Sequence, residues 1–264
     1  MDRNSNGYTF LFAAIMVVVV GSLLAFAATS LKDLQDENIK KEKMQNILAS
    51  VGVVVEREQA PSQFTSVIKE QLALKIDGSV DESSKAFDID LKNELSKKVE
   101  DQRFPLYVAE QDGKKFYIVP LRGAGLWDAI WGYVALEEDL NTIKGTVFDH
   151  KGETPGLGAE ITQKWFQDRF VGEKIMNQSG EIVGVEVAKG NTSQAKDDNK
   201  VDAISGSTIT GNGVTNMIKE RLSNYKNYFD LIILADVIEH IDAGEHEQRV
   251  VRAPCHGGGL VHCG

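Results

Sequence analysis

Residues 114–149 read KKFYIVPLRGAGLWDAIWGYVALEEDLNTIKGTVFD and carry the clearest evidence for the fold class. It contains three β-rich runs, at residues 116–121, 130–136 and 142–149, which are separated by Gly, Asp or Asn. A meander of consecutive strands is the simplest arrangement of such runs. Because helical patterns flank them on both sides, we predict an α+β domain.

The chain beyond these strands is predicted to be partly helical. Residues 161–170 have a helical pattern, and their aromatic side chains are expected in the core: Trp165, Phe166 and Phe170. Residues 177–180, Asn-Gln-Ser-Gly, are typical of a hairpin turn, with the second strand at residues 181–187. A polar loop at residues 191–200 then precedes the last helix.

The N-terminal segment predicts a single membrane-spanning helix. Residues 8–28 are almost wholly apolar and uncharged, about the length that a helix rising ~1.5 Å per residue needs to cross a bilayer. A cleaved signal peptide is the alternative, because Ala25-Phe26-Ala27 fits a small-x-small cleavage site. Arg3 is balanced by Asp2, and the apolar run is longer than a usual signal core, so we predict an anchor over residues 1–30.

Residues 31–113 are predicted to form a helical stalk and an insert. Residues 31–50 place apolar side chains among many charges, which is typical of a solvated helix. Two helix-like pieces follow at residues 64–76 and 87–99, divided by a polar stretch at residues 77–85. The α+β domain is expected at residues 114–229.

A hydroxyl-rich motif precedes the last predicted helix: Asp202-Ala-Ile-Ser205-Gly206-Ser207-Thr208-Ile-Thr210. Gly206 and its small neighbours allow close approach to the Thr208 hydroxyl. Apolar residues then recur at helical spacing: Val214, Met217, Ile218, Leu222 and Tyr225. A helix start there would favour an anion such as a phosphodiester. Alternatively, these residues are ordinary cap residues and Gly211-Asn212-Gly213 is a tight turn.

The hydroxyl-rich motif resembles the sequence that flavin transferases read when they attach FMN to a threonine. His150-Lys-Gly-Glu153-Thr154-Pro155-Gly156-Leu157-Gly158-Ala-Glu-Ile161 is similar to the loop beside the flavin ring in the same proteins. Residues 121–133 and 177–190 extend the likeness. The chain thus resembles the covalent FMN-binding NqrC family of bacterial sodium-translocating NADH:quinone oxidoreductases. The RnfG family of the Rnf electron-transport complex shares both motifs but is typically shorter.

The resemblance implies a set of cofactor-binding residues. FMN would be covalently attached to Thr208, and the flavin ring would be lined by Glu153, Thr154, Gly156, Leu157 and Gly158. The flavin transferase would read Asp202, Ser205 and Gly206. Ser207 stands where the family usually has alanine, a change that is conservative in size.

The resemblance also implies an electron-carrying subunit of a complex that transfers electrons from NADH to ubiquinone and exports sodium. The expected partners are the other subunits, a flavin transferase and membrane lipid. The large domain would lie on the periplasmic side of the bacterial inner membrane, although lysines after the span would favour the cytoplasm by the positive-inside rule. Two alternatives remain: an RnfG protein or free-standing flavin shuttle, and a redox-silent membrane anchor.

The composition argues against one class of partner, and the C-terminal tail does not predict a metal site. A formal net charge of −10 argues against nucleic acid as a partner. Residues 230–264 depart from the family pattern and predict a disordered or non-native tail. Its Cys255-His256 and His262-Cys263 pairs match no standard zinc-ligand spacing, and no loop shows a cation-ligand pattern, so no metal site is predicted.

Overall fold

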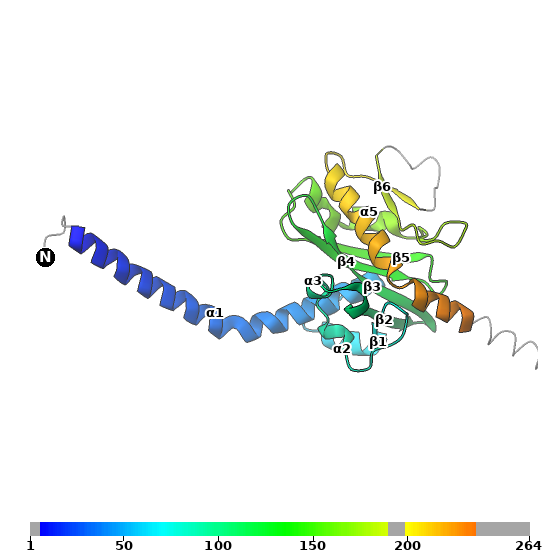
Figure 1. The fold of residues 1–264 in the computed structure, drawn as a ribbon, viewed down its shortest axis with the longest axis horizontal. Coiled ribbons are helices and arrows are strands. Elements are labelled where there is room, and N and C mark those ends of the chain that lie inside the picture. Colours follow the sequence, from blue (N-terminus) through cyan, green and yellow to red (C-terminus); the bar gives the residue numbers. More distant parts are fainter. Residues whose placement is uncertain (1–5, 190–198, 236–264) are drawn as a thin grey trace, which may run out of the picture.

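A five-stranded antiparallel sheet, with its strands in chain order, organises the computed structural model, which describes residues 6–189 and 199–235 (Figure 1). The strands are β1 Ile68–Leu74, β2 Phe104–Gln111, β3 Lys114–Ala124, β4 Ala129–Leu136 and β5 Ile143–His150. The meander predicted for residues 116–149 is therefore confirmed. Asp112 and Gly113 join β2 to β3 with φ values of 52° and 76°, as a two-residue type I′ turn requires.

Both faces of this sheet are buried, which explains the nearly continuous apolar runs in its central strands. On one face, Val119 and Val134 belong to a core that includes helix α5 (Thr208–Ser223). On the other face, Ile118 and Ala135 belong to a second core with the end of helix α1 (Asn6–Ser50) and helix α2 (Ala60–Val67). The sheet is thus the middle of three layers.

Helix α1 combines the predicted anchor and the predicted stalk in one element of 45 residues. Its apolar window has a mean hydropathy of 2.7 with none of it buried, and α1 extends far from the sheet (Figure 1). It is the one helix within residues 6–189 and 199–235 that is long and apolar enough to cross a membrane. Ile47 and Leu48 near its end are fully buried, so α1 joins the candidate span directly to the domain.

The helical prediction for the insert is wrong in two places. Residues 64–67 are helical, as the end of α2, but β1 occupies residues 68–74. β2 also lies before residue 114, so the sheet begins inside the predicted insert. The register shift between Ile68 and Glu70 breaks the two-residue alternation that would have identified β1 as a strand. Residues 87–99 contain only short helical turns, namely η1 Ala86–Asp88, α3 Leu91–Glu94 and the start of η2 Val99–Asp101.

The helices and strands of residues 158–202 are all short. The predicted helix over residues 161–170 is divided into η3 Gly158–Thr162, α4 Lys164–Gln167 and η4 Asp168–Phe170. Phe166 and Phe170 are buried as predicted, but Trp165 is 46% exposed, because its ring lies under the Arg169 guanidinium at 4.8 Å rather than in the core.

The hairpin prediction is half right. The turn at residues 177–180 is confirmed by an antiparallel bridge between Met176 and Ile182. The strand predicted at residues 181–187 is wrong, because β6 (Glu186–Ala188) pairs in parallel with β7 (Lys200–Asp202).

Helix α5 confirms the prediction of a helix after the hydroxyl-rich motif, and all five of the predicted apolar positions are buried. The alternative of a tight turn at residues 211–213 is wrong, because these residues are helical. A Cβ on Gly213 would lie 2.3 Å from the carbonyl oxygen of Ala124, so glycine lets α5 pack closely on β3. Residues 226–235 are also helical, which corrects the prediction of disorder for residues 230–235. The cysteine and histidine pairs of the tail lie outside the described residues.

Candidate functional site

The two predicted motifs meet at one cavity of about 230 Å³ beside the N-terminus of α5. The loop after β5 supplies one wall, the start of α5 supplies the other, and the β3–β4 loop closes one side. The lining residues are Leu126, Glu153, Thr154, Leu157, Gly158, Gly206, Ser207, Thr208, Ile209 and Thr210. Of the predicted site residues, only Gly156, Asp202 and Ser205 are not among those that line the cavity.

Glu153 connects the three segments that form the cavity. Its side chain is buried, and its carboxylate accepts hydrogen bonds from the Trp127 backbone N–H at 3.0 Å and the Thr210 hydroxyl at 2.6 Å. Its own backbone N–H donates to His150 Nδ1 at 3.1 Å. Glu153 therefore holds the β3–β4 loop and α5 to the loop after β5, in addition to lining the cavity.

Two glycines are required by this arrangement. A Cβ on Gly158 would lie 2.2 Å from Glu153 Oε2 and 2.6 Å from Thr210 Oγ1, so any larger residue would disturb that hydrogen bond. Gly206 has a φ of +77°, a conformation that favours glycine, and its Cβ would lie 2.9 Å from the Leu157 side chain. Each of the two motifs therefore needs its glycine, Gly158 or Gly206, to keep the cavity open.

The start of α5 presents backbone donors to the cavity. Thr208 is the first residue of the helix, Ser207 is its N-cap, and the Gly211 N–H donates to the Ser207 carbonyl oxygen at 2.9 Å. The N–H groups of residues 208–210 precede that bond and point out of the helix end, where the dipole also favours an anion. The Ser207 hydroxyl is buried without a hydrogen-bond partner among the described residues.

The other predicted residues surround the cavity. Ser205 and Gly206 are exposed. Asp202 ends β7, and its carbonyl oxygen accepts a hydrogen bond from Arg169 Nη1 at 2.5 Å. Gly156 has a φ of +76° in the exposed turn after Pro155, and its N–H donates to Glu160 Oε1 at 3.0 Å. Asp202, Ser205 and Gly156 thus flank the site without lining it.

Several residues at this site were not predicted from the sequence. Thr210 completes the Glu153 hydrogen bonds, while Leu126 and Ile209 line the cavity and are 45% and 57% exposed. Trp127 is 69% exposed, and its Nε1–H donates to Thr154 Oγ1 at 3.2 Å. One signal was available, since large apolar residues in a short loop between strands are candidates for ligand contact. Within residues 6–189 and 199–235, no group of three His, Cys, Asp or Glu side chains is suited to a metal.

Comparisons with known proteins identify the family of the chain. A family model described as an FMN-binding domain matches residues 125–223. The NqrC protein of the Na(+)-translocating NADH-quinone reductase of Haemophilus ducreyi is 30% identical over 234 residues, which cover 83% of this chain and 90% of that protein. The corresponding protein of Pseudomonas aeruginosa is 30% identical over 239 residues, covering 82% and 91%.

A solved structure gives the same answer. The crystal structure of the corresponding protein from Parabacteroides distasonis has a TM-score of 0.69 and 38% sequence identity, and covers 75% of this chain and 96% of that one. The chain belongs to the NqrC family of the Na(+)-translocating NADH-quinone reductases.

Proposed function

We propose that this chain carries FMN covalently on Thr208 and relays electrons within a membrane complex that oxidises NADH, reduces ubiquinone and exports sodium ions. One observation carries the proposal: Thr208 lies at the N-terminus of α5 and lines a cavity formed by both family motifs. The family match to an FMN-binding domain supports the choice of cofactor.

The residues present fit FMN. Thr208 would hold the phosphate, and the N–H groups at the start of α5 would stabilise its charge. The apolar side chains of Leu126, Leu157 and Ile209 suit the flat ring, with Thr154 and Glu153 beside it. When bound, FMN supplies the ability to accept and donate electrons, and the protein positions it and tunes its potential by packing and hydrogen bonding.

The exposed part of the motif suits recognition by a flavin transferase. Ser205 and Gly206 are exposed, and Thr208 is partly exposed, so a second protein has access to the hydroxyl. Asp202 is held nearby through its backbone bond to Arg169. These features are what a modifying enzyme needs to read residues 202–208.

Helix α1 supports the proposed membrane arrangement. Its apolar part would cross the bacterial inner membrane among lipid and the other subunits, and its buried last turns would hold the domain near the bilayer. We place the domain on the periplasmic side. A covalent link suits that side, because a lost cofactor is not readily replaced outside the cytoplasm.

The test is a Thr208→Val variant of the full chain, co-expressed with a flavin transferase. We expect complete loss of the fluorescent band on denaturing gels and of the FMN-sized mass on the Thr208 peptide. Thr65→Val, which removes an exposed threonine from α2, is the matched control and should keep both signals.

Two results would contradict the proposal. Persistent covalent flavin in the Thr208→Val variant would show that another residue is the acceptor. A dark wild-type band with unmodified Thr208, despite an active transferase, would favour the redox-silent anchor.

A further inference from the structure

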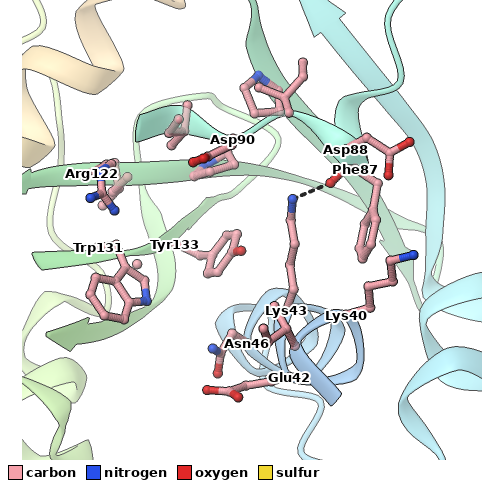
Figure 2. A pocket seen from close by; sticks show the side chains of 17 residues that line it. Lys40, Glu42, Lys43, Asn46, Phe87, Asp88, Asp90, Arg122, Trp131 and Tyr133 are labelled. Carbon is pink, nitrogen blue, oxygen red and sulfur yellow. Dashed lines mark hydrogen bonds between the residues drawn. The ribbon is translucent and has the colours of Figure 1, made fainter. Parts of the chain in front are cut away.

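A second, larger cavity lies on the opposite face of the sheet from α5, where α1 meets β3 and β4. Its volume is about 610 Å³, within the usual range for small-molecule sites. Figure 2 shows its walls, which come from α1, from the segment 87–91 and from the sheet. None of its lining residues belongs to the cavity beside Thr208.

The interior of this cavity is aromatic and apolar. Trp131 and Tyr133 project from β4 on the α1 side of the sheet, and Phe87 lies on the far side of the Lys43 side chain (Figure 2). Pro105, Pro120 and Leu121 add apolar surface. A flat ring is the chemical group that such walls accept best, since aromatic side chains favour offset or edge-on contact with another ring.

Two hydrogen-bond donors converge inside the cavity. The Tyr133 side chain is mostly buried, and its hydroxyl, which is open to the cavity and has no hydrogen-bond partner within the described part of the chain, is directed toward Lys43 (Figure 2). The Lys43 ammonium donates to the Phe87 carbonyl oxygen at 2.5 Å and lies 4.7 Å from the centre of the Phe87 ring. An ammonium has three donors, so this bond leaves capacity for a ligand.

Charged side chains of both signs line the cavity, including the exposed Lys40 and the partly buried Arg122. Glu42, Asp88 and Asp90 line the cavity but are exposed at its rim, and Asp90 also accepts from the Lys92 backbone N–H. Lys43 lies deeper, and burial lowers the pKa of its ammonium despite the nearby Asp88 and Asp90 carboxylates. An anionic group inside the cavity would offset that loss of solvation, because an opposite charge stabilises a desolvated ammonium.

We propose that this cavity binds a small aromatic carboxylate, with its ring against Trp131 and its carboxylate accepting hydrogen bonds from Lys43 and Tyr133. Such a ligand contacts α1 and the sheet at once. The site is independent of the flavin proposal, because it uses none of the residues around Thr208.

The probe is 2-naphthoate, titrated calorimetrically into the full-length chain in detergent. We expect saturable binding that weakens at least about tenfold in Tyr133→Phe, which removes only the hydroxyl, and in Lys43→Met. Trp165→Phe, an aromatic change outside the cavity, should bind like the wild type. Lys43→Gln, which keeps a donor for Phe87, serves if Lys43→Met unfolds.

Three outcomes would overturn the proposal. The first is no saturable binding of 2-naphthoate, and the second is equal binding by the wild type, Tyr133→Phe and the Lys43 variant. The third is equal binding of neutral 2-naphthalenemethanol, which would show that the carboxylate is not recognised.

Discussion

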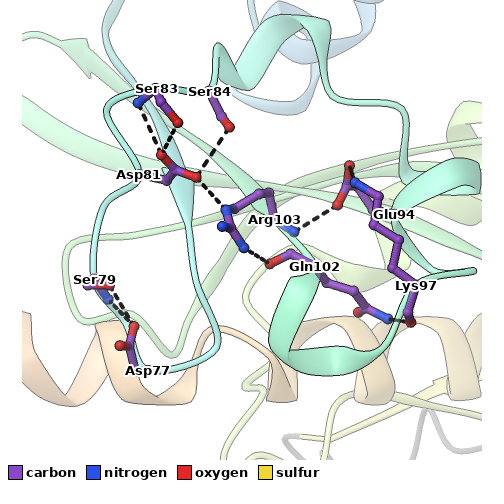
Figure 3. A network of polar contacts seen from close by, with 9 residues as sticks. All are labelled: Asp77, Ser79, Asp81, Ser83, Ser84, Glu94, Lys97, Gln102 and Arg103. Carbon is purple, nitrogen blue, oxygen red and sulfur yellow. Dashed lines mark hydrogen bonds and ion pairs between the residues drawn. The ribbon is translucent and has the colours of Figure 1, made fainter.

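The loops around Asp81 and the cavity beside Thr208 both contain carboxylates with little exposure, but the two regions satisfy them differently. In the loops, Asp81 accepts from Arg103 Nε at 2.5 Å and from the Ser83 hydroxyl, and Glu94 accepts from Lys97 Nζ at 2.6 Å and from the Arg103 backbone N–H (Figure 3). Each carboxylate thus has a cationic partner and at least one further donor. We call this arrangement a closed network, because its carboxylates are satisfied by partners within the protein.

The polar side chains beside Thr208 have fewer hydrogen-bond partners. Glu153 has only uncharged donors, Trp127 N–H and the Thr210 hydroxyl, among the hydrogen bonds of its carboxylate, and the Ser207 hydroxyl has no partner within the described residues. Buried polar groups usually find partners in the protein or in bound water. Buried polar groups without partners beside a cavity therefore indicate a binding site, whereas a closed network indicates a structural role.

The largest expected effect is from Glu153→Ala. It leaves two donors, on Trp127 and Thr210, without their acceptor, so we expect the free energy of unfolding of the flavin-free chain to fall by about 3 kcal/mol. Urea unfolding of the full chain in detergent, followed by tryptophan fluorescence, measures it. Glu153→Gln keeps one acceptor oxygen and should lose clearly less. Equal losses in both variants would show that the hydrogen bonds of the carboxylate do not hold the loops together.

A smaller effect is expected in the closed network. Hydrogen bonds from the Ser83 hydroxyl and the Arg103 guanidinium hold the pKa of the Asp81 carboxyl well below its ordinary value of 3.8. A carboxyl with a lowered folded-state pKa contributes stability above its unfolded pKa, about 3.9, and that stability is lost as the pH falls toward the folded value. We therefore expect Asp81→Asn to lower the Tm by a few degrees at pH 7.

The pH dependence of this Tm difference tests the role of the Asp81 charge more directly. The Tm difference between the wild type and Asp81→Asn should be constant from pH 7 to about pH 5 and should decline below about pH 4. Asp77→Asn is the matched control. Asp77 also bonds a neighbouring serine, Ser79, but has no arginine partner among the described residues, so its Tm difference should be smaller throughout. A Tm difference for Asp81→Asn that does not change with pH would contradict the role given to its charge.

Local sequence patterns account for the parts of the fold and of the candidate site that could be predicted. The predicted site residues lie in two short motifs, and residues close in sequence have little freedom to separate once Gly156 and Gly206 set the turns. The helix after Thr208 was visible because its buried positions repeat at a single helical period. The central strands were visible because both faces of the sheet are buried, which makes them strongly apolar.

The rest depends on contacts that are distant in the sequence. β1 lies at the edge of the sheet and carries a register shift, so its apolar residues do not alternate. The parallel pairing of β6 and β7 joins segments on either side of residues 190–198, which no local turn signal specifies. Thr210 was missed because its role comes from a hydrogen bond to Glu153, 57 residues away. Local patterns cannot identify such partners.

The smallest expected effect is from Ser207→Ala, and it tests the comparison most directly. The Ser207 hydroxyl is buried without a partner among the described residues, so removing it should raise the free energy of unfolding of the flavin-free chain by about 1 kcal/mol. In the flavin-loaded chain the hydroxyl has a potential partner in the phosphate or the ring. There we expect the free energy of unfolding of Ser207→Ala to be no higher than that of the wild type. Urea unfolding of both forms measures the two differences.

The control for this last prediction is Ser50→Ala in α1. Ser50 is similarly buried, but its hydroxyl donates to the Ile47 carbonyl oxygen at 2.6 Å, so alanine there should be neutral or destabilising. If Ser207→Ala also destabilises the flavin-free chain, the Ser207 hydroxyl is satisfied, for example by bound water, and the contrast with the Asp81 network disappears. If alanine at 207 stabilises both forms equally, the hydroxyl is an unpaired cost that flavin does not use. Only a stabilisation that is lost when flavin is bound fits a polar group kept for the cofactor.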